Sequence, residues 1–263
     1  MRRKLVWTVF LAVAVPLVPP RPLDAQETGN LEAGSWRFQG LGLEIGLARQ
    51  GLSDELASPL RHRGLGFQGG VSLRRSGERS AWDLELLGEL ARIESRIADS
   101  EGGYEELYRA ALSYAHLRTV GRPLDGRLQL YVGGRIAAAV QYRSHEYRSL
   151  QSEDFAEGIV PLELAGRWDL ALDPRTRVEH RVSVPLVSLV LRTPYSGLKY
   201  VPDPELAGPT RARGFTSHLM LARRLTERLA LAAFHRISVF HYPDPLPLSW
   251  VSHGFGIELE LLR

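Results

Sequence analysis

Apolar and polar residues alternate along most of the chain beyond residue 36. In the segment 37–49, every second position is apolar, and these positions are Leu41, Leu43, Ile45 and Leu47. The positions between them carry Gly40, Gly42, Glu44 and Gly46. Successive side chains of a β-strand point to opposite faces, so this pattern predicts a strand with one apolar and one polar face.

The same alternation recurs in ten segments, which we predict to be ten strands. They are 37–49, 62–75, the segment from 81, 104–118, 127–143, 160–170, 177–190, 211–224, 228–241 and 250–263. In 104–118 both faces carry apolar residues. Most of the segments exceed the ~5–6 residues of an ordinary strand and suffice for the ~9–11 that cross a membrane. Eight or twelve strands are the alternative counts.

The connections between these segments alternate in length. Short links are expected at 76–80, 119–126, Asp173-Pro174 and 225–227. The other links, at 50–61, 98–103, 144–156, 193–210 and 242–249, are mostly longer. Short turns at one rim and longer loops at the other are typical of transmembrane β-barrels. The sequence therefore predicts an all-β fold, an antiparallel up-and-down transmembrane barrel with both ends on the periplasmic side.

Aromatic residues gather near the expected strand ends. Amphipathic rings favour the headgroup level of a membrane. We therefore predict an aromatic girdle consisting of Trp36, Trp82, Trp168, Tyr104, Tyr142 and Trp250.

The N-terminus predicts export. Met1-Arg2-Arg3-Lys4 is basic, an apolar run reaches Val18, and Ala25 precedes Gln26. This order is typical of a cleaved secretory signal. We predict a signal peptide at 1–25 with cleavage near Ala25, a periplasmic segment at 26–36 and the barrel at 37–263.

Charge and cysteine content narrow the possible partners. Residues 1–25 hold four basic residues and one acid, so of 33 basic and 30 acidic residues 29 of each remain after cleavage. Without a basic excess, a nucleic-acid partner is not expected. The chain has no cysteine, which excludes disulfides and a lipid attached through cysteine. No zinc motif, phosphate loop or dinucleotide fingerprint is present, so we expect no cofactor and no metal.

The polar face carries charges of both signs, which we place in the barrel lumen. They are Glu44, Arg74, Asp83, Glu85, Glu89, Arg135, Glu163, Arg167, Asp169, Arg177, Glu179 and Arg181. Pairing across the turns would bring together Arg74 and Asp83, Asp169 and Arg177, and Arg167 and Glu179. Because buried charges need partners, we interpret the set as a salt-bridged plug. A narrow path for ions or small solutes is the alternative.

A catalytic site finds little support in the sequence. Adjacent Ser–His pairs, such as Ser217-His218, point to opposite faces of a strand. A cross-strand couple of His218 with Ser183, both on the inner face, remains the candidate nucleophile–base pair.

The chain resembles the small outer-membrane β-barrels of Gram-negative bacteria, and its strand count matches the ten-stranded omptin architecture. The resemblance covers about 37–263 and departs at the C-terminus, where such proteins usually end in an aromatic residue and this chain ends Leu262-Arg263. It implies outer-membrane lipid and lipopolysaccharide as surroundings. It also implies the barrel-assembly machinery and periplasmic chaperones as partners during biogenesis.

We therefore expect an outer-membrane barrel with a structural role or a narrow, porin-like pore. One alternative is an outer-membrane hydrolase, either a lipid A deacylase or an omptin-like protease. Another is a surface-binding barrel that acts through its Pro-rich loops at 193–210 and 242–249. A secreted soluble β-sandwich is a third class.

Overall fold

A computed structural model describes residues 38–263 except 56–57, 96–103, 147–152, 193–203 and 245. The expected signal peptide, the segment 26–36 and Trp36 lie outside the described residues. The strands are β1 (Phe38–Asp54), β2 (Ser58–Ser76), β3 (Ser80–Ser95), β4 (Tyr104–Gly121), β5 (Leu128–Glu146), β6 (Glu153–Ala171), β7 (Thr176–Arg192), β8 (Glu205–Ala207), β9 (Arg213–Arg224), β10 (Leu229–Tyr242) and β11 (Leu248–Leu262).

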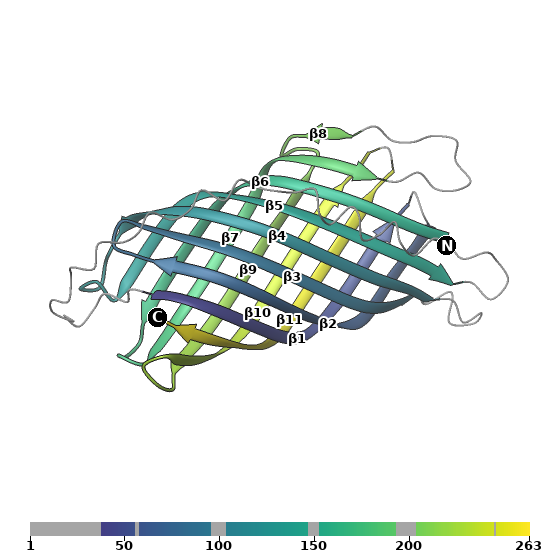
Figure 1. Ribbon diagram of the computed structural model, residues 1–263. Helices are drawn as coiled ribbons and strands as arrows, with labels where there is room; N and C mark the ends of the chain where they lie inside the picture. The colour runs from purple at the N-terminus through teal and green to yellow at the C-terminus, as the bar shows by residue number, and fades with distance from the viewer. Residues whose placement is uncertain (1–37, 56–57, 96–103, 147–152, 193–203, 245) are drawn as a thin grey trace. The chain divides into compact units, whose positions relative to one another are not determined.

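Ten of these strands form a closed antiparallel barrel (Figure 1). Each strand pairs with its neighbours in chain order, and β1 closes the barrel by pairing with β11 from Gly40↔Leu262 to Asp54↔Leu248. The short β8 is an extra strand that pairs only with the end of β7. The predicted all-β fold and the count of ten barrel strands are confirmed, whereas β8 was not predicted.

The two faces of the wall are inverted relative to a soluble protein. Outward-facing side chains are apolar and exposed, and Phe67 and Ile45 leave 67% and 63% of their surface uncovered. Inward-facing side chains are polar and buried, and Glu179 is 0% exposed. Alternation in the sequence produces this arrangement directly, because each strand presents its apolar set to one side. No helix among the described residues is long and apolar enough to cross a membrane.

The strands differ from the prediction mainly at one rim. The rim with the short connections, here the turn rim, has links at 77–79, 122–127, 172–175 and 225–228, close to those expected. At the opposite rim, here the loop rim, strands are longer than predicted. For example, β1 reaches Asp54 and β2 starts at Ser58, so most of the expected loop 50–61 is strand. Backbone pairing continues there although the apolar alternation has ended.

A glycine on β1 lets an acidic side chain of β11 reach over β1 to β2 along the inner wall. A Cβ atom on Gly42 would lie 1.8 Å from the Oε1 of Glu258. A barrel of about eight strands has room only for side chains, and ten strands add little. The absence of a side chain at Gly42 therefore leaves the space that the Glu258 carboxylate occupies.

Candidate functional site

A network of buried ion pairs fills the lumen near the turn rim. Its members, here the inner cluster, are Arg74, Asp83, Arg167, Asp169, Arg177, Glu179, Arg181, Glu258 and Glu260. Arg167 is its centre, with guanidinium nitrogens 2.7 Å from Asp169, 3.0 Å from Glu179 and 3.4 Å from Asp83. It also donates to the hydroxyl of Ser76 at 2.7 Å. One arginine thus joins carboxylates from β3, β6 and β7.

The inner cluster continues to the strand that closes the barrel. Arg74 of β2 lies 2.7 Å from Glu258 and 3.3 Å from Glu260, both on β11. Arg177 of β7 lies 2.6 Å from the same Glu260. Because Arg177 is also near Glu179, at 3.9 Å, the chain of contacts crosses the lumen from β2 and β11 to β6 and β7.

A second group of ion pairs, here the outer cluster, lies near the loop rim. Arg143 pairs with Asp54 and Glu157, and Arg192 pairs with the other oxygen of Asp54. Arg192 also donates to the carbonyl oxygen of Leu246 at 2.6 Å. Both arginines are buried. Charged groups therefore cross the lumen at both rims.

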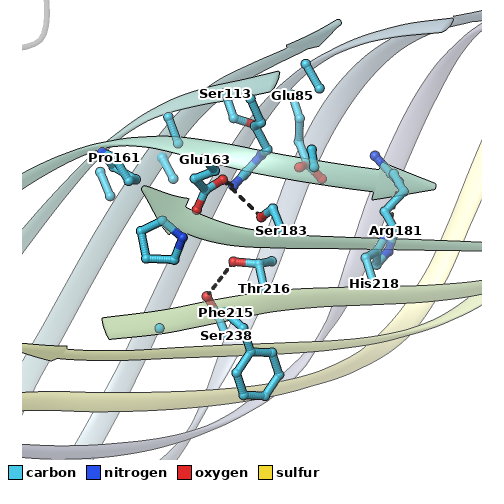
Figure 2. A pocket seen from close by; sticks show the side chains of 18 of the residues that line it. Glu85, Ser113, Pro161, Glu163, Arg181, Ser183, Phe215, Thr216, His218 and Ser238 are labelled. Carbon is cyan, nitrogen blue, oxygen red and sulfur yellow. Dashed lines mark hydrogen bonds and ion pairs between the residues drawn. The ribbon is translucent and has the colours of Figure 1, made fainter. Parts of the chain in front are cut away.

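Between the two clusters lies a cavity of about 140 Å³. Four arginines and four acids line it, together with small and apolar side chains. Figure 2 shows Ser183, Thr216 and Ser238 along its wall. Ser183 donates to Glu163 at 3.0 Å, and the hydroxyls of Thr216 and Ser238 are 3.4 Å apart.

The structure places all twelve predicted lumen charges on the inward face, but not all in the expected pairs. Arg74 lies opposite Asp83 in the ladder, yet its ion pairs are with β11. Arg167 contacts Glu179 as expected. The pair of Asp169 with Arg177 is wrong, because Asp169 lies opposite Glu179. The turn 172–175 is centred one residue further along than assumed, which shifts the register by two.

Several charged lumen residues were missed by the sequence analysis. They are Asp54, His62, Glu105, Arg109, Glu157, Arg192, Arg236, Glu258 and Glu260. Some lie in strand ends that were assigned to loops, and two lie on β4, whose apolar residues on both faces hid the pattern. Most of them continue the every-second-position series of a predicted strand beyond its apolar residues, so a longer strand assignment would have included them.

The proposed couple of His218 with Ser183 is wrong. Ser183 lies opposite Thr216, and His218 lies opposite Arg181. The hydroxyl of Ser183 donates to Glu163, whereas the Nδ1 of His218 is 2.7 Å from Arg181. The Ser–His contacts that do form, including Ser217 with His180 at 2.9 Å, are on the outward face and were not predicted.

The predicted girdle needs one correction. Trp82, Trp168, Tyr104 and Tyr142 alternate with buried inward residues and so belong to the outward face. Trp250 lies inside, where it lines the cavity and the guanidinium of Arg109 lies 4.0 Å from its ring centre. Position 250 has the same parity on β11 as the inward residues Ser252 and Glu258, which decides its face.

At the loop rim, Arg211 connects the two Pro-rich loops. Its guanidinium contacts Asp244 at 2.6 Å and also Glu205. These carboxylates raise the pKa of Arg211. At the turn rim, the N–H groups of Arg175 and Thr176 donate to Asp173 and lower the pKa of its carboxyl. Among the described residues, no cluster of three or more His, Cys, Asp or Glu side chains could hold a metal ion.

Comparison with solved structures supports the fold. The chain is similar to the outer membrane protease OmpT from Escherichia coli, with 6% identity over 85% of this chain and 97% of that one and a TM-score of 0.51. It also matches the translocator domain of the autotransporter NalP from Neisseria meningitidis, with 11% identity, coverage of 84% and 88% and a TM-score of 0.45. No protein-family model and no curated protein matches the sequence. At such identity the likeness to OmpT shows the fold alone. The chain thus has a closed ten-stranded antiparallel barrel fold that is similar to that of a bacterial outer-membrane protein.

Proposed function

We propose that this protein is a bacterial outer-membrane β-barrel whose lumen is closed by buried ion pairs, so that it serves as a structural barrel and not as an open pore. The exposed apolar outer face and the expected signal peptide support the location. Processing near Ala25, contact with lipopolysaccharide and delivery by chaperones and assembly machinery are parts of the same proposal.

The observation that carries the proposal is the inner cluster. Arg74 and Arg167 are 1% and 3% exposed, and each has carboxylates from more than one position around it. Removing one member of a buried ion pair typically costs ~3–5 kcal/mol, because the partner charge stays buried alone. Such a network resists the displacement that a passing ion would require.

A current measurement tests the closed lumen. The mature chain is refolded in detergent and run on a gel with and without boiling. A folded barrel migrates differently before boiling, and we call this change the heat-modifiable shift. The folded protein is then inserted into a planar bilayer. We expect no stable conductance steps from the wild type. In the charge-neutral double variant Arg74→Ala/Glu258→Ala, which deletes one buried pair, we expect steps to appear.

The matched control is Arg92→Ala/Glu94→Ala, which deletes a pair whose side chains are 61% and 50% exposed. This control should conduct no more than the wild type. Regular ohmic steps from the wild type, with ion selectivity set by lumen arginines, would instead support the narrow-pore alternative and contradict the closed lumen.

The hydrolase alternative gains no support from the cavity. Ser183 donates a hydrogen bond to the Glu163 oxygen that is also paired with Arg135. The Nδ1 of His218 accepts from Arg181, so Ser183 and His218 do not form the expected nucleophile–base pair. An ion pair with a guanidinium makes a carboxylate a weaker base, so Glu163 is poorly suited to activate Ser183. We therefore do not propose hydrolysis of lipid A or peptides.

A further inference from the structure

Among the residues that the structure describes, the backbone ladder between β7 and β9 is interrupted. Their ladder runs from Thr176↔Arg223 to Ser183↔Thr216 and stops there. Beyond this point, β7 pairs with β8 instead, from Ser188 to Val190. The four residues 184–187 of β7 lie between these two ladders, and we call this stretch with the start of β9 the open seam.

The sequence explains why pairing stops. Pro185 has no N–H to give to a neighbouring strand. The ladder between β6 and β7 also shifts here, since Glu163 is opposite Pro185 and Leu162 is opposite Val187. The extra residue, Leu186, marks a β-bulge, which bends a strand and changes its direction. Together these features turn β7 away from β9.

The lumen cavity reaches the open seam. Its lining includes inward-facing residues such as Ser183 and Thr216, and also Val182 and Phe215 from the outward face. The latter two are 44% and 43% exposed on the barrel exterior. Figure 2 shows the Phe215 ring pointing away from Glu163 and Ser183. The cavity thus reaches the wall at the end of the ladder between β7 and β9.

The surface around the open seam is apolar. The outward residues of β7 on this stretch, Val184 and Leu186, are exposed, as are Leu219 and Leu221 further along β9. A wall with this surface faces lipid hydrocarbon if the barrel spans a membrane. In a membrane, the outer side of the open seam would therefore face lipid and not water.

His218 has a polar ring atom in the cavity without a hydrogen-bond partner among the described residues. The Nδ1 of His218 lies 2.7 Å from a guanidinium nitrogen of Arg181. A guanidinium only donates, so Nδ1 is the acceptor and the proton of the neutral ring is on Nε2. That Nε2 is buried without a hydrogen-bond partner among the described residues, and His218 is 4% exposed and lines the cavity. A buried donor left unpaired is costly, so it favours a ligand that brings an acceptor.

The charges of the cavity are already balanced. Its lining arginines are Arg109, Arg135, Arg181 and Arg236, and its lining acids are Asp83, Glu85, Glu89 and Glu163. Each arginine has an acidic partner. A further ionised group would therefore be buried without a counter-charge, which favours an uncharged ligand.

We propose that the cavity binds an uncharged amphiphile that enters from the lipid through the open seam. A carbonyl oxygen, such as that of an ester, accepts the Nε2–H of His218, and the apolar chain lies in the seam against Val182 and Phe215. A dry cavity of roughly 150 Å³ holds one benzene molecule, so this one takes the head group and the first carbons of a chain. The inference rests on the membrane location proposed above.

Trp250 offers a direct readout, because it lines the cavity. The mature chain is prepared with Trp36, Trp82 and Trp168 changed to Phe, so that Trp250 is its only tryptophan. Bromine quenches indole fluorescence on contact. We expect methyl 6-bromohexanoate to quench Trp250 in a saturable manner. The anion 6-bromohexanoate should require a roughly tenfold higher concentration for the same quenching, because it is charged. 1-Bromoheptane should also require a roughly tenfold higher concentration, because it has no oxygen to accept the hydrogen bond.

A companion protein that keeps only Trp168, on the outward face, measures simple partitioning of each probe into the detergent. All three probes should quench it without saturation. Equal quenching of Trp250 by ester and bromoalkane, or no quenching of Trp250 while Trp168 responds, would overturn the inference.

Two pairs of variants locate the ligand. Ala139 lines the cavity, whereas its neighbour Ala138 points outward. Ala139→Phe should abolish saturable quenching and Ala138→Phe should leave it unchanged. His218→Gln keeps a donor near the Nε2 position and should bind, whereas His218→Asn lacks it and should bind roughly tenfold more weakly.

The heat-modifiable shift is recorded for every variant. A folded Ala139→Phe protein that still binds the ester with wild-type affinity contradicts the site while leaving the proposed barrel intact. Loss of the shift in the wild type itself would instead count against the membrane barrel.

Discussion

Two seams in the wall behave very differently. The closing seam joins β1 and β11 with an unbroken ladder from Gly40↔Leu262 to Asp54↔Leu248. The open seam between β7 and β9 ends after Ser183↔Thr216. The closing seam joins the two ends of the barrel, whereas the paired residues of the open seam are only 33 to 47 positions apart. Separation in sequence therefore does not decide how completely two strands pair.

Local chemistry accounts for the contrast. Gly46 lies opposite Gly256 in the closing seam, and a Cβ on Gly256 would lie 2.2 Å from the carbonyl oxygen of Ile45. The two backbones approach closely because neither position has a side chain. In the open seam, Pro185 and a bulge take the place of such glycines. The two glycines allow close backbone pairing in the closing seam. In the open seam, the missing N–H of Pro185 prevents one backbone hydrogen bond.

The largest effect is expected from breaking the closing seam. Gly256→Ala places a methyl group against a backbone carbonyl that has no freedom to move, so we expect a loss of ~1–3 kcal/mol in unfolding free energy. Urea unfolding followed by the heat-modifiable shift measures it. Gly51→Ala is the control on the same seam, because its Cβ would have no neighbour closer than 3.9 Å. Equal destabilisation by both changes would contradict the close-approach argument.

A smaller difference is expected between the two seams in the wild type. Amides of residues 184–187 that point toward β9 should exchange with deuterium at least about tenfold faster than amides of β1 that point toward β11. The reason is that interrupted ladders open locally at lower free energy. Mass spectrometry of peptides from both seams checks this. Uniform protection along β7 would mean that the open seam is paired in solution.

The smallest effect concerns the turn that leads into the paired half of β7. Asp173 accepts from two backbone N–H groups, which lowers its pKa below that of the unfolded chain. Its carboxylate thus stabilises the fold above an unfolded pKa of ~3.9, and the contribution disappears as pH falls through the lowered folded value. Asp173→Asn should lower the urea midpoint slightly at pH 7 and by less at pH 3. A larger difference in urea midpoint between the wild type and Asp173→Asn at pH 3 than at pH 7 would contradict the lowered pKa.

Part of the site could be read from the sequence. Glu44, Arg135 and Glu163 were assigned to the lumen from alternation alone, and they lie inside. The assignment succeeds because the two faces of a strand are fixed by its pleat, a local property. Trp250 shows how it fails. As a tryptophan near a strand end, it was expected at the membrane interface. Its position belongs to the inward-facing series of β11, which places it in the cavity.

The lumen residues near the loop rim could not be predicted from the sequence, for a different reason. Asp54 and Arg192 lie beyond the apolar runs that mark the membrane-facing part of each strand. Their strands continue there because backbone hydrogen bonds and the ion pairs of the outer cluster hold them. Apolar alternation reports contact with lipid, so it gives no signal where a strand extends past it.

The sequence by itself determined the all-β class, the ten barrel strands, their turns and the face of most side chains, because each depends on neighbouring residues. Tertiary structure decided which charges meet and where the wall opens. Arg74 reaches Glu258 across 184 positions, and β7 leaves β9 at a point set by the register of three strands. Such contacts depend on how the barrel closes, and closure is a property of the whole ring of strands.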